Sequence, residues 1–164
     1  MATSGHLHFQ NYPAGVPHTV DVEEFRSIAE VFDKSVAAYA DRIAYINMGK
    51  AITYRELDDL SRRFGAYLQS RVGLKKGARV ALMMPNLLQY PVALFGALRA
   101  GCTVVNCNPL YSARELHHQL SDSGAEAIVV VENFAHVVAE VASKTALKAV
   151  FTTGLGDMLG FPKS

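Results

Sequence analysis

Apolar residues recur at helical and strand spacings along most of the chain. Between residues 21 and 41 they step by three or four positions, which predicts a first helix with one apolar face. Residues 42–48 then alternate, and Gly49-Lys50 has the composition of a two-residue type II′ turn. Residues 42–48 and 51–54 are therefore predicted to pair as an antiparallel hairpin. The periodic residues of the first helix are Phe25, Ile28, Phe32, Val36 and Tyr39.

Two capping boxes mark the starts of later helices. Thr53 and Glu56 stand three residues apart before one apolar stripe, and Ser112 and Glu115 repeat this spacing before another. In a capping box the hydroxyl accepts from a free backbone amide of the first turn, and the glutamate accepts from the amide of the cap residue. One helix should therefore follow Thr53 and end at Gly73, where glycine can adopt the left-handed conformation of a helix end.

Four short apolar runs alternate with these helical patterns. Nearly unbroken apolar runs are typical of buried parallel strands, and their alternation with helices indicates a sheet covered on both faces. We expect an α/β fold, with a mostly parallel sheet flanked by helices and the antiparallel hairpin near the start. The predicted strands are residues 79–84, 102–106, 127–131 and 147–152, and the helices between them lie within 87–100, 113–124 and 134–144, the last capped by Asn133.

The composition fits one domain with surfaces that something else covers. Of the 164 residues, half are hydrophobic and 19% are charged, with a formal net charge of +1. Soluble domains average about 25% charged residues. The near-neutral balance gives no electrostatic footprint for nucleic acid, and no apolar run approaches the ~20 residues of a membrane span. Residues 1–11 are expected to be a disordered terminus or a remnant of cloning, and residues 12–164 to be the folded part.

Local chemical motifs are weak. Cys102 and Cys107 are interpreted as two reduced, packed thiols, and no spacing of potential ligands predicts a metal site. The glycines at 154, 156 and 160 miss the dinucleotide fingerprint by one position, and no helix can follow them, so they predict a surface turn. The adjacent Asp58 and Asp59 are expected on the solvated face of their helix. The residues alone predict an α/β domain without chemistry of its own.

Three longer segments carry a family resemblance. AITYRELDDLSRRFGAYL is followed by GLKKGARVALMMPNLLQYPVALFGALRAGCTVVNCNPLY and then by SARELHHQLSDSGAEAIVV. In this order and at these distances they resemble the N-terminal domains of adenylate-forming ligases. The stretch NPLYSARELHHQLSDSGA resembles bacterial long-chain fatty-acid–CoA ligases in particular. One departure is Ala78, where the family usually has Asp in the turn before a strand, which removes a turn hydrogen bond without catalytic meaning.

The resemblance implies a two-step reaction in the parent enzyme. A fatty acid attacks ATP to give an acyl-adenylate and pyrophosphate, and the thiol of CoA then displaces AMP. The family uses ATP, Mg²⁺ and CoA, but its phosphate-gripping loop, its Mg²⁺ residues and its adenylating lysine lie downstream of the matching segments. The chain is therefore expected to be an incomplete N-terminal subdomain that is inactive alone, with no catalytic, cofactor-binding or metal-ligating residue.

One turn matches a position near the CoA approach in related ligases. It consists of Asn108, Pro109, Leu110 and Tyr111. The alternative is a structural connection in which the proline ends a strand and the tyrosine packs under the next helix. The resemblance also implies the remainder of the ligase chain, a fatty acid and CoA as partners, and a cytoplasmic enzyme for which a peripheral position at the inner membrane stays open.

Two other functions remain open. A free-standing α/β module could recruit a partner through an uncovered face without catalysis. A dehydrogenase nucleotide domain is disfavoured because the glycine fingerprint is incomplete. The chain stops directly after its last predicted strand, so we expect exposed apolar surface, marginal stability and self-association of the isolated chain.

Overall fold

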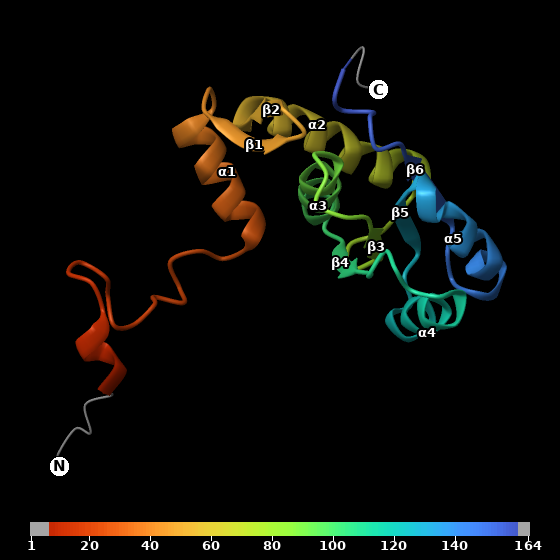
Figure 1. Cartoon of the computed structure of the whole chain (residues 1–164), viewed down its shortest axis with the longest axis horizontal. Coiled ribbons are helices and arrows are strands. Elements are labelled where there is room, and N and C mark those ends of the chain that lie inside the picture. Colours follow the sequence, from red (N-terminus) through yellow and green to blue (C-terminus); the bar gives the residue numbers. More distant parts are fainter. Residues whose placement is uncertain (1–6, 161–164) are drawn as a thin grey trace.

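A computed structural model describes residues 7–160 of the chain (Figure 1). It contains a two-stranded antiparallel hairpin and a four-stranded parallel sheet with helices on both faces, as predicted. Residues 7–27, which precede the first α-helix, extend away from the body of the molecule (Figure 1). The elements are η1 Leu7–Asn11, α1 Ile28–Tyr39, β1 Ile43–Asn47, β2 Lys50–Thr53, α2 Tyr54–Tyr67, η2 Leu68–Val72, β3 Arg79–Met83, α3 Gln89–Arg99, β4 Thr103–Asn106, α4 Ala113–Ser123, β5 Ala127–Val131, η3 Glu132–Phe134, α5 Ala135–Val141, η4 Ala142–Lys144 and β6 Ala149–Thr153.

The chain terminus was expected to be disordered over residues 1–11. Residues 1–6 lie outside the described residues, and residues 7–11 form the 3₁₀ helix η1. Within residues 7–160, none of the helices combines the length and the apolar character that a bilayer crossing requires.

The first α-helix is shorter than predicted. It begins at Ile28 instead of residue 21, because Ser27 caps it and the Ser27 hydroxyl accepts from the Glu30 amide at 3.1 Å. Phe25 belonged to the predicted apolar stripe but precedes the helix. Of that stripe, Phe32 is buried and Ile28 is 62% exposed. The apolar periodicity therefore begins before the helix itself does. The spacing of Ser27 and Glu30 marks the actual start of the helix.

The hairpin pairs as predicted, but its turn is displaced by one residue. Met48 and Gly49 occupy the turn with φ of 49° and 79°, and two positive φ values define a type I′ turn. Asn47 consequently pairs with Lys50, which begins β2. The prediction of a Gly49-Lys50 turn was wrong because Met48 adopts a conformation that non-glycine residues seldom take.

The parallel sheet has the strand order β4-β3-β5-β6. β3 lies in the middle, and its Val80 pairs with Val104 on one side and Ala127 on the other. Alternate β3 residues face opposite layers: Leu82 belongs to the core under α3 and η2, whereas Met83 belongs to the core under α4 and α5. Burial on both faces explains the unbroken apolar runs of the sequence.

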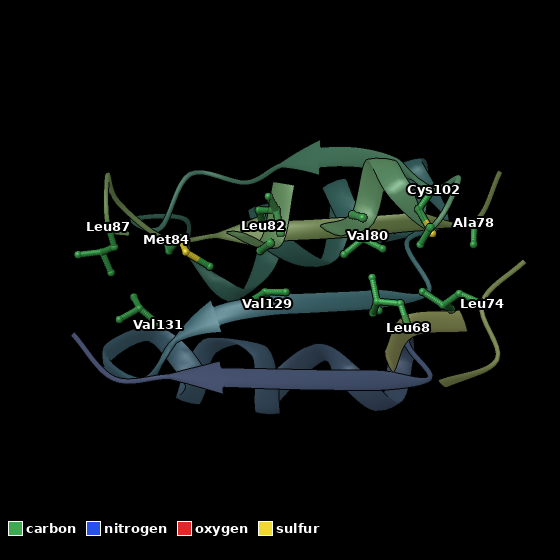
Figure 2. Close-up of a cluster of buried hydrophobic side chains, with 14 residues drawn as sticks. Leu68, Leu74, Ala78, Val80, Leu82, Met84, Leu87, Cys102, Val129 and Val131 are labelled. Carbon is green, nitrogen blue, oxygen red and sulfur yellow. The ribbon is translucent and has the colours of Figure 1, made fainter. Parts of the chain in front are cut away.

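The first of these cores is drawn in Figure 2, where side chains from β3 and β5 lie in one layer with those of η2 and the loops around it. Its fully or nearly buried members include Leu68, Val80, Leu82, Ala97, Ala127 and Val131. α2 and α3 cross above it at two glycines. A Cβ on Gly65 would lie 2.8 Å from the Gly96 carbonyl oxygen, so only glycine allows this approach.

Capping chemistry fixes several helix ends among the described residues. Both predicted capping boxes form, with hydroxyl and glutamate bonds present at Thr53 and at Ser112. Gly73 and Gly124 end the corresponding helical segments in the left-handed conformation. The prediction that Asn133 caps a helix was wrong. The chain first makes the 3₁₀ turn η3, and α5 begins after Phe134 with no side-chain cap.

A mostly buried cation, Arg99, joins α1, α2 and α3. The Arg99 guanidinium donates to Asp58 Oδ1 at 2.5 Å, to Asp33 Oδ1 at 2.6 Å and to the Ser61 hydroxyl at 2.8 Å. It also lies over the ring of Phe32, 4.7 Å from the centroid. Asp58 was expected to be solvated, but its side chain is only 19% exposed, whereas the neighbouring Asp59 is 56% exposed.

Candidate functional site

The carboxyl ends of the parallel strands form the edge at which α/β sheets usually bind ligands. The chain leaves β3 towards α3 on one face, and it leaves β4 and β5 towards α4 and α5 on the other. Strand order therefore reverses at the carboxyl end of β3, and crevices at such reversals are the usual ligand sites of this architecture. The loops that follow β3, β4, β5 and β6 meet at this edge.

The turn Asn108–Tyr111 lies directly after β4 at this edge. The Asn108 side chain accepts from the Leu110 amide at 3.0 Å, and the Asn108 carbonyl accepts from the Tyr111 amide at 3.1 Å. Tyr111 is half-buried and packs against the core under α4, as the structural alternative requires. Leu110 is 78% exposed, so its side chain is available for contact with another molecule or segment.

Polar side chains connect the end of β4, just before this turn, to α3 and α4. Tyr90 at the start of α3 donates its hydroxyl hydrogen to Asn106 Oδ1 at 2.8 Å. Gln119 of α4 donates to the Asn106 carbonyl at 2.9 Å, and its own Oε1 is buried without a partner in the described structure. These two bonds hold the end of β4 between α3 and α4. Sequence reasoning missed them because the bonded residues lie 13 and 16 positions apart.

The loop after β6 is the predicted glycine turn. Asp157 accepts from the Thr153 hydroxyl at 2.9 Å and from the Gly154 amide at 2.8 Å. The nearly buried Gln89 donates to the Gly154 carbonyl at 2.8 Å, which joins α3 to this loop. A Cβ on Gly154 would lie 2.9 Å from Asp157 Oδ1 and 3.3 Å from Glu132 Oε1. Gly154 therefore lies in a tight turn, and its backbone amide donates to the Asp157 side chain of the same loop.

The two thiols do not supply a nucleophile. Cys102 and Cys107 are both free and buried, as predicted. Burial raises the pKa of Cys107 to about 11, and burial followed by the nearby Glu126 charge raises that of Cys102. A thiol with a raised pKa carries almost no thiolate at neutral pH.

The described residues also lack a group of three or more His, Cys, Asp or Glu side chains that could hold a metal ion. The carboxyl edge therefore combines a fixed backbone turn, amide and hydroxyl groups, the carboxylates of Glu132 and Asp157 and an exposed leucine. These groups can position a ligand by hydrogen bonds and contact.

Comparison with known proteins gives the affiliation of the chain. A family model described as "AMP-binding enzyme" matches residues 32–163. A long-chain-fatty-acid–CoA ligase of Escherichia coli is 59% identical over 152 residues, which cover 93% of this chain and 27% of that protein. The corresponding ligase of Haemophilus influenzae is 56% identical over 155 residues, covering 94% and 28%. The chain thus spans little more than a quarter of the length of these relatives.

Solved structures agree in fold. A long-chain-fatty-acid–CoA ligase from Archaeoglobus fulgidus superposes with a TM-score of 0.70 at 25% identity, covering 84% of this chain and 28% of that one. A benzoate–CoA ligase from Burkholderia xenovorans gives a TM-score of 0.70 at 26% identity, covering 76% and 25%.

Proposed function

This chain belongs to the family of AMP-binding enzymes, and we propose that it forms the N-terminal part of a long-chain fatty-acid–CoA ligase. The observation that carries the proposal is the identity of 56–59% over more than nine-tenths of the chain with proteins named as such ligases.

The proposed overall reaction has two balanced steps. The carboxylate of a fatty acid attacks the α-phosphorus of ATP, so that a mixed anhydride forms and pyrophosphate leaves. The thiol of CoA then attacks the acyl carbon, which forms a thioester and releases AMP. Mg²⁺ would balance the phosphate charge in the first step. The described residues do not fit this metal, so we assign the ATP and Mg²⁺ groups to the remainder of the ligase chain.

The role proposed for this chain is structural support and contact with CoA. Asn108 and Tyr111 fix the turn after β4, and this leaves the exposed Leu110 to contact the thiol-bearing arm as it approaches. The fatty acid, CoA and the rest of the ligase chain are the proposed partners, and the cytoplasm is the proposed location. A peripheral membrane position stays a prediction.

A chimeric enzyme tests the proposal directly. The matching segment of the Escherichia coli ligase is replaced by residues 12–160 of this chain, and formation of palmitoyl-CoA is measured with ATP and Mg²⁺. We expect activity within tenfold of the unmodified ligase. A folded chimera that rejects palmitate but activates a short or aromatic acid would contradict the long-chain assignment.

A second measurement separates the ligase proposal from a free-standing binding module. The isolated 164-residue chain should show no ATP–pyrophosphate exchange with any fatty acid, because neither a phosphate loop nor an adenylating lysine has been found in it. Robust exchange by the purified chain would refute the division of roles proposed above. A folded chimera inactive with every acid would favour the binding module.

The turn is tested within the active chimera. Leu110→Asp should raise the KM for CoA several-fold with little change in kcat, because it adds a charge at an exposed contact. Ile43→Asp provides a control at an aliphatic residue that is 56% exposed on β1, outside the loops of this edge. Equal kinetics for both variants would indicate that Asn108–Tyr111 is a structural connection only.

A further inference from the structure

The amino edge of the parallel sheet carries a local excess of positive charge. This edge is the end at which the strands begin, opposite the carboxyl edge, and Leu74 and Ala78 mark it in Figure 2. Residues 71–79, 122–126 and 140–148 lead into β3, β5 and β6 there, and together they contain six lysines and arginines and three carboxylates. The six cations, all of which are exposed, are Arg71, Lys75, Lys76, Arg79, Lys144 and Lys148.

Backbone hydrogen bonds hold these segments side by side. The Glu126 amide donates to the Arg79 carbonyl at 2.8 Å, and the Lys148 amide donates to the Glu126 carbonyl at 2.7 Å. These three residues therefore lie on neighbouring chains, about 4.8 Å apart in turn. The loop before β3 is fixed to the next strand because the Gly77 amide donates to the Gly101 carbonyl at 2.8 Å. The positive charges thus lie along one rigid edge.

Most of these cations are not neutralised by carboxylates of the chain. The Lys148 ammonium pairs with the Glu126 carboxylate. Among residues 7–160, the other five cations have no carboxylate within ion-pair distance. The remaining acids of this edge, Asp122 and Glu140, are exposed to water. The edge therefore presents net positive charge to solvent.

The ends of the helices explain only part of this pattern. Cations at a helix C-terminus offset the partial negative charge of the helix dipole, and Arg71 and Lys144 lie in the last turns of helical segments. Lys75, Lys76 and Arg79 lie beyond the end of η2, so helix capping does not require them.

The charge of the chain is also unevenly distributed. Its formal net charge is only +1, but residues 21–41, which include α1, contain six carboxylates and two cations. An acidic segment and a basic edge therefore coexist in a nearly neutral molecule. Such a distribution orients a protein in an external field, because the basic edge is attracted to an anionic surface and the acidic segment is repelled by it.

We propose that the amino edge docks on a bilayer that contains anionic phospholipids, so that the carboxyl edge faces away from the membrane. Lysines and arginines close to an anionic leaflet are each attracted to it, and this attraction needs neither a pocket nor an apolar anchor. The inference goes beyond the proposed ligase function and does not depend on it, since the chimera tests catalysis and vesicles test docking.

A nucleic acid fits this edge less well than a lipid surface does. Sites for single strands combine cations with aromatic side chains that stack on the bases, and residues 71–79, 122–126 and 140–148 contain no aromatic residue. Helices that bind phosphates point their N-termini at them, whereas α4 ends at this edge.

Co-sedimentation of the purified 164-residue chain with vesicles measures docking. The vesicles contain either phosphatidylcholine alone or phosphatidylcholine with about one-third phosphatidylglycerol. Binding to the anionic vesicles should be at least tenfold stronger at about 0.1 M salt. It should disappear at about 1 M salt, because the Debye length falls from about 10 Å to about 3 Å.

Matched charge reversals locate the docking face. A Lys75→Glu, Lys76→Glu double variant should weaken binding to the anionic vesicles at least tenfold. A Lys50→Glu, Arg114→Glu double variant changes the net charge by the same amount at exposed residues of β2 and α4 that lie outside the amino edge. It should weaken binding less than threefold. Circular dichroism confirms that each variant is folded.

A gain of binding provides a test that loss of folding cannot imitate. Asp122→Lys replaces an exposed carboxylate of this edge with a cation and should strengthen binding several-fold. Equal losses in the two double variants would indicate attraction to net charge alone and overturn the docking face. Salt-independent binding to both kinds of vesicle would reveal adsorption through apolar surface. That result, no binding, or tighter binding to duplex DNA than to the anionic vesicles would refute the proposal.

Discussion

Replacing Asp58 by Asn should destabilise the fold much more than the same replacement at Asp59. The two residues are neighbours on α2, and each pairs with an arginine four positions later, Arg62 or Arg63. They differ in what else they contact. Asp58 also accepts from Arg99, whose side chain is only 13% exposed, whereas the Asp59 pair is exposed on both sides, at 56% and 75%.

The burial of Arg99 sets the expected size of the difference. Removing one partner of a fully buried ion pair costs about 3–5 kcal/mol, because the remaining charge is left uncompensated. Arg99 would keep Asp33 and two uncharged acceptors, the Asp58 carbonyl and the Ser61 hydroxyl, so about 2 kcal/mol is expected for Asp58→Asn. An exposed helical pair contributes about 0.3–0.5 kcal/mol, which is the expected effect of Asp59→Asn.

The pH dependence provides an independent check. Burial raises the pKa of Asp58, but hydrogen bonds from Arg62 and Arg99 outweigh it and the pKa is lowered overall. A carboxyl group with a lowered folded-state pKa stabilises the fold above its unfolded-state pKa, and this stabilisation is lost as the pH falls through the folded-state value. The stability difference between the unchanged chain and Asp58→Asn should therefore shrink in acid.

Urea unfolding followed by far-ultraviolet circular dichroism measures both effects, since the chain contains no tryptophan for fluorescence. The midpoint should fall clearly for Asp58→Asn at neutral pH, with an unchanged slope, and hardly move for Asp59→Asn. Equal midpoints for the two variants at neutral pH would refute the idea that the Arg99 network stabilises the three-helix contact.

Three further results follow from the same structure. Gly96→Ala should lower the free energy of unfolding by about 1–3 kcal/mol, because the new Cβ would lie 2.8 Å from Phe64 Cδ1; an unchanged urea midpoint would contradict this. Capping hydrogen bonds lower the pKa values of Glu56 and Glu115, so the stability that these carboxylates add is lost as the pH falls. Below about pH 4 the free energy of unfolding should therefore decrease more steeply in the unchanged chain than in a Glu56→Gln, Glu115→Gln double variant. Cys107, with a pKa of about 11, should react with a disulfide reagent at neutral pH far more slowly in the folded chain than in urea, and equal rates would show that its burial is incomplete.

Local signals in the sequence predicted most of the fold. The capping boxes at Thr53 and Ser112 formed as expected, because each bonds atoms only three residues apart. The four parallel strands were found from their apolar runs. The central strands β3 and β5 are buried on both faces, whereas the edge strands β4 and β6 are partly exposed. Errors arose where geometry overrode composition. Met48 accepts a positive φ to complete a type I′ turn, and Asn133 lies within a 3₁₀ turn instead of capping a helix.

The candidate site was less predictable because it is built from residues far apart in the chain. The end of β4 is held by bonds from Tyr90 and Gln119 to Asn106, which lie 16 and 13 positions from it, and periodicity shows that a residue lies on a face without showing what faces it. Asp58 illustrates the same limit, since its sequence neighbourhood is polar and its partner Arg99 lies 41 positions away. The turn at Asn108–Tyr111 was found only through resemblance, because no local motif marks it. Resemblance could propose where a ligand approaches, whereas the tertiary arrangement was needed to find the hydrogen bonds that hold the end of β4 before that turn.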